Sequence, residues 1–209
     1  MQFISKWFAD LLQFFYGLTN NYGMAILLLT VTYRLILIPL SWTQRKSMIQ
    51  MKELAPKQKE IQEKYKDNPQ EANKRIMELY KENKANPFSG CLVALLQLPI
   101  AIILFNVLRS TDVTGVSFLW IKDLSKPDLI LVLLTGLVAY FQMSAEATDT
   151  NKTTAITFPI FITFIGMTIA SGVSLYFFAT YVLSYAENSV MTMLFNRKKA
   201  GVEGGKQND

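Results

Sequence analysis

The stretch GMAILLLTVTYRLILIPLSW, from Gly23 to Trp42, carries one charged side chain, Arg34, near its middle. About twenty mostly apolar residues suffice for a helix to cross the hydrocarbon core of a bilayer. A central arginine opposes insertion by about 2.5 to 3.5 kcal/mol, so it usually faces a bundle interior or a wet cavity. The stretch therefore predicts a membrane span, and Arg34 is a candidate functional residue.

The composition of the whole chain supports this interpretation. Of the 209 residues, 51% are hydrophobic and the mean hydropathy is positive, which is more apolar surface than a soluble domain of this size could bury. We therefore predict an all-α polytopic membrane protein. Hydropathy places its five transmembrane helices at residues 21–43, 91–110, 128–145, 154–171 and 172–195.

Basic residues predict the orientation in the membrane. Segment 44–90 carries eleven Lys or Arg and the tail 196–209 carries four, so both are predicted to be cytoplasmic, together with the short loop 146–153. Loop 111–127 and its flank from Arg109 carry only three, and are predicted to face outward. The N-terminus is then outside and the C-terminus is in the cytoplasm, which predicts a multi-pass protein of the plasma membrane. No signal peptide precedes the first span, although an outside N-terminus normally follows from one, and its removal stays an open alternative.

Residues 1–20 have the pattern of an amphipathic helix. Apolar side chains from Ile4 to Leu18 recur at helical spacing, with Lys6 and Asp10 on the opposite face. Such a helix suits the outer membrane interface, and the alternative is a helix packed only against protein. Trp42 and Trp120 stand where aromatic residues anchor membrane proteins at the two interfaces.

Segment 44–90 has the composition of a soluble, charged excursion, with seven acidic residues beside its eleven basic ones. Asp67-Asn68-Pro69 predicts a turn between two helices. The hairpin's predicted role is contact with a partner, such as anionic headgroups or ribosomal RNA, and the alternative is a merely solvated hairpin. Its predicted apolar seam is thin and consists of Ile61, Tyr65, Ile76, Leu79 and Tyr80.

Polar side chains inside the spans predict a binding groove. Thr30 shares a helical stripe with Arg34, whereas Thr32 lies on the far side. At 1.5 Å per residue, Gln97 lies about 9 Å and Arg34 about 12 Å from the cytoplasmic ends of their helices, so their depths match. We predict a hydrophilic groove that is open to the cytoplasm. Its predicted lining is Arg34, Thr30, Gln97, Gln142, Tyr181 and Ser184.

A sealed polar core is the competing interpretation. Within it, or beside a groove, Glu187 on the last span lies at a depth comparable to that of Arg34 and could neutralise its charge. Such a pair would be structural rather than substrate-facing.

Residue content argues against an enzyme. The chain has no histidine and one cysteine, Cys91, which excludes histidine-based catalysis, His/Cys metal sites and an internal disulfide. It has no Walker A pattern and no paired membrane aspartates. We therefore expect no catalytic residue, no metal, no cofactor and no DNA partner. A small transporter or channel with an Arg-containing aqueous cavity remains the alternative, although five unequal spans lack the repeated halves typical of transporters.

Three runs of sequence resemble the YidC/Oxa/Alb family of membrane protein insertases. The most specific features are an arginine followed by Pro39 in the first span, and the run GCLVALLQLP from Gly90 to Pro99. The similar runs are TYRLILIPLSWTQRKSMIQMKELAPKQKEIQEKYKDN (Thr32 to Asn68), NPFSGCLVALLQLPI (Asn86 to Ile100) and SLYFFATYVLSYAEN (Ser174 to Asn188).

The resemblance implies an insertase that moves short hydrophilic flanks of client proteins across the bilayer. It implies that Arg34 receives the polar part of the inserting segment, that Gln97 and Gln142 line the groove, and that the hairpin captures clients. The large extracytoplasmic domain of Gram-negative members has no counterpart in the sequence, so the chain is similar to the short Gram-positive type. The implied partners are nascent membrane-protein clients and the lipid bilayer, with the ribosome and the Sec translocon as further candidates.

Overall fold

The computed structural model describes residues 2–83, 85, 89–111, 113–147 and 152–205. These residues form seven α-helices and no β-strand, apart from one isolated bridge between Phe118 and Ile121. The predicted all-helical fold is thus confirmed. The helices are α1 (Gln2–Thr19), α2 (Tyr22–Lys64), α3 (Pro69–Glu82), α4 (Ser89–Ser110), α5 (Leu129–Glu146), α6 (Lys152–Gly166) and α7 (Ser171–Gly205).

The chain divides into two compact units, and α2, α4 and α7 each contribute to both. The first unit holds residues 1–38 and 95–186, and the second holds 39–94 and 187–209. No helix ends at the predicted segment boundaries 43/44 and 195/196, because α2 and α7 continue through them. Residues 44–64 are rich in Lys, Gln, Glu and Met, which favour helix. This propensity carries α2 on beyond its apolar part.

The first unit is built around a core of large apolar side chains from α1, α2, α4 and α7 and from the loop before α5. From α1 this core takes Phe8 and Leu12, whereas Trp7 and Leu18 on the same predicted stripe are exposed. The helix therefore packs on protein along one edge and leaves a second apolar edge uncovered. Its location at a membrane interface stays a prediction. The fully buried large side chains include Leu12, Ile26, Leu29, Leu104, Leu131 and Tyr176.

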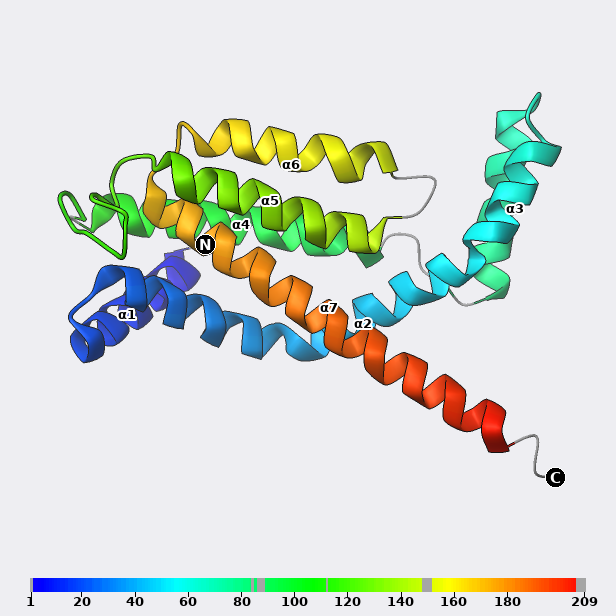
Figure 1. Ribbon diagram of the computed structural model, residues 1–209, viewed down its shortest axis with the longest axis horizontal. Helices are drawn as coiled ribbons and strands as arrows, with labels where there is room; N and C mark the ends of the chain where they lie inside the picture. The colour runs from blue at the N-terminus through cyan, green and yellow to red at the C-terminus, as the bar shows by residue number, and fades with distance from the viewer. Residues whose placement is uncertain (1, 84, 86–88, 112, 148–151, 206–209) are drawn as a thin grey trace. The chain divides into compact units, whose positions relative to one another are not determined.

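Helices α5 and α6 lie side by side (Figure 1). They approach closely at two points, at Gly136 of α5 and at Gly166 of α6. A Cβ atom at Gly136 would collide with Oγ1 of Thr163, and one at Gly166 would lie 3.0 Å from Cγ1 of Val132. Small residues allow this close approach between apolar helices. Helix α6 ends at Gly166, five residues before the predicted end of that span, and the chain turns there toward α7.

The second unit contains the predicted helical hairpin, formed by the end of α2 and by α3. The turn is as predicted, because the Asn68 side chain accepts a hydrogen bond from the Glu71 N–H (3.2 Å) and Pro69 opens α3. The hydroxyl of Tyr80 donates to Oε1 of Gln58 at 2.7 Å. Burial of this ring raises the pKa of Tyr80.

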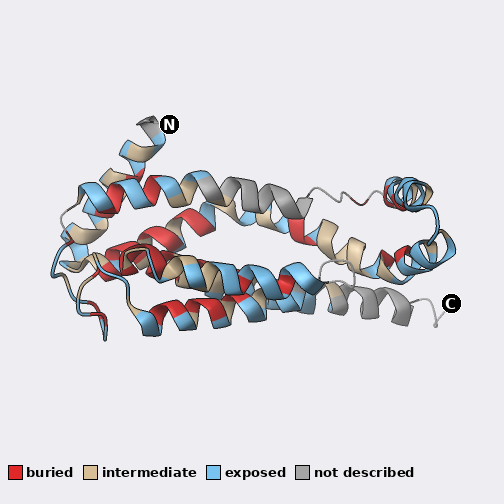
Figure 2. Ribbon diagram, turned by 90° about the horizontal axis from the view of Figure 1, so that it is seen from above, coloured by how far each residue is buried: buried red, intermediate tan, exposed pale blue. Residues whose placement is uncertain are grey.

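The apolar seam of the hairpin contains four of the five predicted residues and gains Met51, Leu54 and Ala85. Ile76 and Tyr80 are buried, and Ile61 and Leu79 pack against them. Leu54, one turn before Gln58, joins the buried cluster, while Tyr65 does not belong to it. Most of the remaining hairpin surface is exposed (Figure 2).

Among the described residues, α2 alone is both long and apolar enough to cross a bilayer by length and composition. Three shorter apolar stretches occur at Pro99–Ser110, Leu129–Ala145 and Lys152–Gly166. The count of five spans stays a prediction. The side chain of Cys91, on α4, and residues 148–151 of the predicted loop 146–153 lie outside the described residues.

The close approach of α5 and α6 is testable by compensating substitutions. Gly136→Ala should lower the free energy of unfolding in detergent by about 1 to 3 kcal/mol, because its methyl group overlaps the Thr163 side chain. Adding Thr163→Ala should restore most of that loss. Gly17→Ala is the control, since a Cβ there meets nothing within 4 Å. A double variant no more stable than Gly136→Ala alone would contradict this packing.

Candidate functional site

Arg34 on α2 is buried, with 8% of its surface exposed, and it bonds to α7 within the first unit. Its Nη2 donates to the carbonyl oxygen of Thr180 at 2.9 Å and to the hydroxyl oxygen of Ser184. Neither acceptor carries a formal charge. Hydrogen bonds from an ionised donor are stronger than neutral ones, so these contacts hold the guanidinium in an apolar helix without an ion pair between the three residues.

A second set of hydrogen bonds is centred on Gln97 of α4. Its partners are sequence neighbours of the residues in the arginine's own hydrogen bonds. The hydroxyl of Tyr33 donates to Oε1 of Gln97 at 3.1 Å, and Nε2 of Gln97 donates to the hydroxyl of Tyr176 at 2.7 Å. Tyr33 directly precedes Arg34, and Tyr176 lies one turn before Thr180. The amide of Gln97 therefore links α2, α4 and α7 at the level where the arginine is bound.

Sequence reasoning found Arg34, Gln97 and Ser184 but missed the two tyrosines as polar partners. A signal was available: Tyr176, Thr180 and Ser184 recur every four residues and so share one face of α7. A buried tyrosine hydroxyl also usually has a hydrogen-bond partner. Both features together predict a polar stripe on α7.

Three other predicted site residues have different surroundings. Thr30 is fully buried and its hydroxyl donates to the carbonyl oxygen of Ile26 at 2.7 Å, within its own helix. The half-buried ring of Tyr181 stacks on Phe177, with centroids 6.3 Å apart. Gln142 is half-buried on α5 and belongs to neither hydrogen-bond set. The structure thus brings Arg34 together with Ser184, and Gln97 together with Tyr33 and Tyr176. Contact of these polar groups with water stays a prediction.

Glu187 has a cationic partner within the second unit. Its Oε2 lies 3.7 Å from Nη2 of Arg45, and the two side chains are 22% and 9% exposed. Arg45 was not singled out from the sequence, although it follows Arg34 by eleven residues, about three helical turns, and so shares its face of α2. The predicted pairing of Glu187 with Arg34 would join residues of different units, and it stays a prediction.

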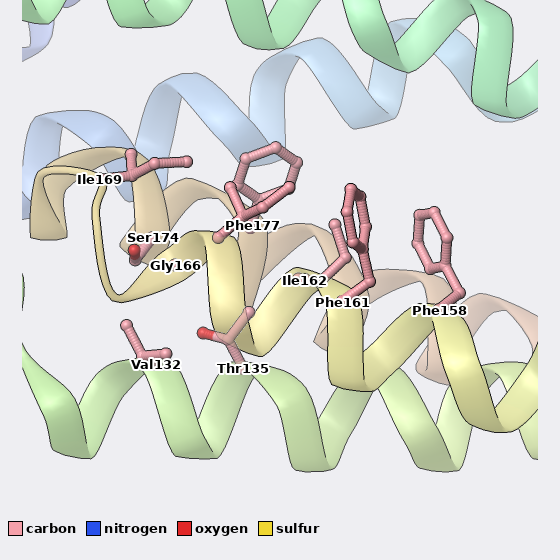
Figure 3. A pocket seen from close by; sticks show the side chains of 10 residues that line it. Val132, Thr135, Phe158, Phe161, Ile162, Gly166, Ile169, Ser174 and Phe177 are labelled. Atoms are coloured by element: carbon pink, nitrogen blue, oxygen red, sulfur yellow. The ribbon is translucent and has the colours of Figure 1, made fainter.

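An apolar cavity of about 240 Å³ lies between α5, α6 and α7 (Figure 3). Its wall contains no charged side chain, and the Thr135 hydroxyl in it already donates to the Leu131 carbonyl oxygen at 2.7 Å. Apolar cavities of comparable size stay dry and accept apolar ligands. This cavity is therefore unsuited to a hydrophilic ligand. Its lining is Val132, Thr135, Phe158, Phe161, Ile162, Ile165, Gly166, Ile169, Ser174 and Phe177.

The polar cluster of α2, α4 and α7 is thus the better candidate site. Its chemistry is that of binding, because it offers a guanidinium and several hydroxyl and amide groups. In the part of the chain that the structure describes, no three His, Cys, Asp or Glu side chains are grouped to hold a metal ion.

Comparisons with known proteins point to one family. A family model described as "60Kd inner membrane protein" matches residues 14–199. The membrane protein insertase YidC of Wolinella succinogenes is 40% identical over 205 residues, which are 94% of this chain and 38% of that protein. YidC of Clostridium tetani is 42% identical over 139 residues, which are 65% of this chain and 63% of that protein.

A solved structure gives the same result at the level of the fold. It is described as an active YidC insertase crystal structure with the first transmembrane domain resolved. The match has a TM-score of 0.73 at 34% identity and covers 87% of this chain and 45% of that one. YidC of Helicobacter pylori is 38% identical and, like the Wolinella relative, is matched over 38% of its length. The chain therefore spans well under half of the length of the Wolinella and Helicobacter relatives.

The bonding of Gln97 is testable by removing its partners one at a time. Tyr176→Phe should lower the free energy of unfolding by about 1 to 3 kcal/mol, because it leaves the half-buried amide N–H of Gln97 without this acceptor. The triple variant Tyr33→Phe, Tyr176→Phe, Gln97→Met should recover most of this loss, since the amide and both hydroxyls are removed together. Exposed Tyr140→Phe is the control. Unchanged stability of Tyr176→Phe in denaturant titrations would exclude the network.

Proposed function

Because the chain belongs to the 60Kd inner membrane protein family, we propose that it is a membrane protein insertase. Membership confirms the resemblance to the YidC/Oxa/Alb insertases that the sequence predicted, while assignment to the short type stays a prediction. The proposed activity moves short hydrophilic flanks of client proteins across the bilayer and releases their hydrophobic segments into lipid. The observation that carries the proposal is Arg34, a buried guanidinium held by neutral oxygens of α7.

The physical task of such a protein is to lower a desolvation barrier. A polar flank that crosses lipid loses its hydrogen bonds to water, and each unsatisfied group costs several kcal/mol. We infer that α2, α4 and α7 line a groove that is open to the cytoplasm and offers replacement partners partway across. The hydrogen-bonding groups of Arg34, Gln97 and Ser184 support this, since they gather on three otherwise apolar helices.

Arg34 acts by charge in this mechanism. A carboxylate in the client's flank replaces a neutral oxygen of Thr180 or Ser184 as the acceptor of the guanidinium, and the resulting hydrogen bond is stronger. With the N-terminus outside and the C-terminus in the cytoplasm, the membrane potential then favours outward movement of that acidic group. Its contribution is about 2.3 kcal/mol per charge per 100 mV.

The apolar part of the client moves along the outer surfaces of the same helices. Leu35 and Ile36 follow Arg34 on α2 and are exposed, as is Val182, which lies between Thr180 and Ser184 on α7. Each helix therefore has a polar face and an apolar face in the same turns. A client segment can keep its polar flank in the groove while its hydrophobic side chains meet lipid.

The hairpin of the second unit is the proposed place of client capture at the cytoplasmic face. Its thin seam leaves most charged side chains in solvent, including Arg75, which is paired with Glu71 and Glu78 on α3. These pairs raise the pKa of Arg75. Anionic headgroups, the ribosome and the Sec translocon are its proposed partners.

The role of the charge is testable with a client that carries an acidic flank. Arg34→Ala should reduce insertion of this client roughly tenfold or more, because a charge-assisted hydrogen bond contributes about 1.5 to 3 kcal/mol. Arg34→Lys keeps the charge but loses the planar donor pair, and it should retain much of the activity. The measurement is protease protection of the client in proteoliposomes with matched amounts of protein.

Two controls separate the proposal from its alternatives. Arg109→Ala removes an exposed arginine from the end of α4 and should insert the client like the unaltered protein. A client with a neutral flank should depend less on Arg34. Equal insertion by all variants would contradict the electrostatic mechanism, and uptake of small solutes without client insertion would favour a transporter or channel.

A further inference from the structure

The loop between α4 and α5 contains a tight turn whose tip carries two exposed apolar side chains. They belong to Leu119 and Trp120, which are 73% and 44% exposed. Leu119 has a φ of 53°. This left-handed conformation is rare for a bulky residue with a Cβ atom. Such strain persists only where the surrounding structure imposes it, and it often marks a functional position.

The rest of the loop is well bonded and imposes this conformation. Phe118 and Ile121 exchange two backbone hydrogen bonds of 2.8 Å, which close the tight turn around Leu119 and Trp120. The ring of Phe118 is buried in the space that a side chain at Gly23 of α2 would need. The turn is therefore fastened to the core of the first unit, and only its tip faces outward.

Asp123 holds the loop together through hydrogen bonds to residues on both sides of it in the sequence. Its carboxylate accepts hydrogen bonds from the N–H groups of Gly115 (3.1 Å) and Ser125 (2.9 Å) and from the Ser125 hydroxyl (2.6 Å). These bonds lower the pKa of Asp123 to about 2, so the carboxylate is ionised under any physiological condition. The loop is thus an ordered structure that presents an apolar tip.

Trp120 is oriented toward the start of α5. Its indole N–H donates to Oδ1 of Asp128 at 3.3 Å, and the same oxygen caps α5 by accepting from the Leu131 N–H at 2.8 Å. The next exposed side chains on α5, Leu129 and Ile130, are apolar. Asp128 therefore marks the start of an apolar helix, and the indole N–H of Trp120 is hydrogen-bonded at this point.

We propose that Leu119 and Trp120 insert into the headgroup boundary of a phospholipid bilayer and fix the level at which α5 enters the lipid. Tryptophan favours this boundary because its ring is apolar and its N–H is polar. The exposed Lys122 on the same loop complements lipid phosphates, whereas Lys126 is paired with Asp123, its Nζ lying 3.3 Å from Oδ2. This contact is independent of the groove and of client insertion.

The test uses the fluorescence of Trp120 alone, in a Trp7→Phe, Trp42→Phe protein reconstituted into vesicles of phosphatidylcholine and phosphatidylglycerol. A nitroxide near the headgroup should quench the indole more than one near the end of the acyl chain. The emission should be shifted to the blue of N-acetyltryptophanamide in water, and iodide should quench it less than that reference.

A matched variant tests the contribution of Leu119. Asparagine tolerates the left-handed conformation, so Leu119→Asn should keep the turn while removing its apolar side chain. We expect a red shift of the emission and stronger quenching by iodide. Lys122→Gln should abolish the gain in nitroxide quenching that phosphatidylglycerol brings over phosphatidylcholine.

Two results with the Trp7→Phe, Trp42→Phe protein that retains Leu119 would overturn the proposal. One is quenching by iodide equal to that of N-acetyltryptophanamide, which would place the tip in water. The other is protection from iodide and from both nitroxides, which would place it against protein, such as a second copy of the chain.

Discussion

The structure of the first unit depends on keeping one guanidinium hydrogen-bonded inside an apolar helix. A charge without partners in a low-dielectric interior is strongly destabilising. The oxygens of Thr180 and Ser184 on α7 meet this need. Both of these acceptors are neutral, and under the proposed mechanism a client carboxylate takes the place of one of them.

The polar contacts around Arg34 and the apolar cavity of the first unit lie among different sets of helices, which have α7 in common. The amide of Gln97 uses its oxygen for Tyr33 and its nitrogen for Tyr176, so it orders α4 against α2 and α7 at the level of the arginine. The cavity beside Phe177, between α5, α6 and α7, has no comparable polar groups. We propose that a hydrophilic flank replaces its bonds to water at the polar groups of Arg34, Gln97 and Ser184.

Sequence alone was sufficient for much of this fold, and it failed where a side chain's partner decides its role. Depth and helical face identified Arg34, Gln97 and Ser184, and the Asp67-Asn68-Pro69 signal placed the hairpin turn. Tyr33 and Tyr176 were missed because aromatic residues in an apolar run indicate packing before hydrogen bonding. Thr30 shares the stripe of Arg34, yet its hydroxyl bonds to its own helix, which spacing cannot reveal. Arg45 was overlooked because it is one of eleven basic residues in segment 44–90, and only the structure pairs it with Glu187.

The most direct test of a water-filled groove is the reactivity of single cysteines with a membrane-impermeant thiol reagent added from the cytoplasmic side. In a Cys91→Ala background, Gln97→Cys and Ser184→Cys should react, and Ser184→Cys should react more slowly once Arg34 is replaced by Gln, because a nearby guanidinium stabilises the thiolate. Leu104→Cys, at a fully buried core position, should remain unmodified. Failure of both groove cysteines to react in folded, reconstituted protein would establish a sealed polar core instead and would contradict the proposed mechanism.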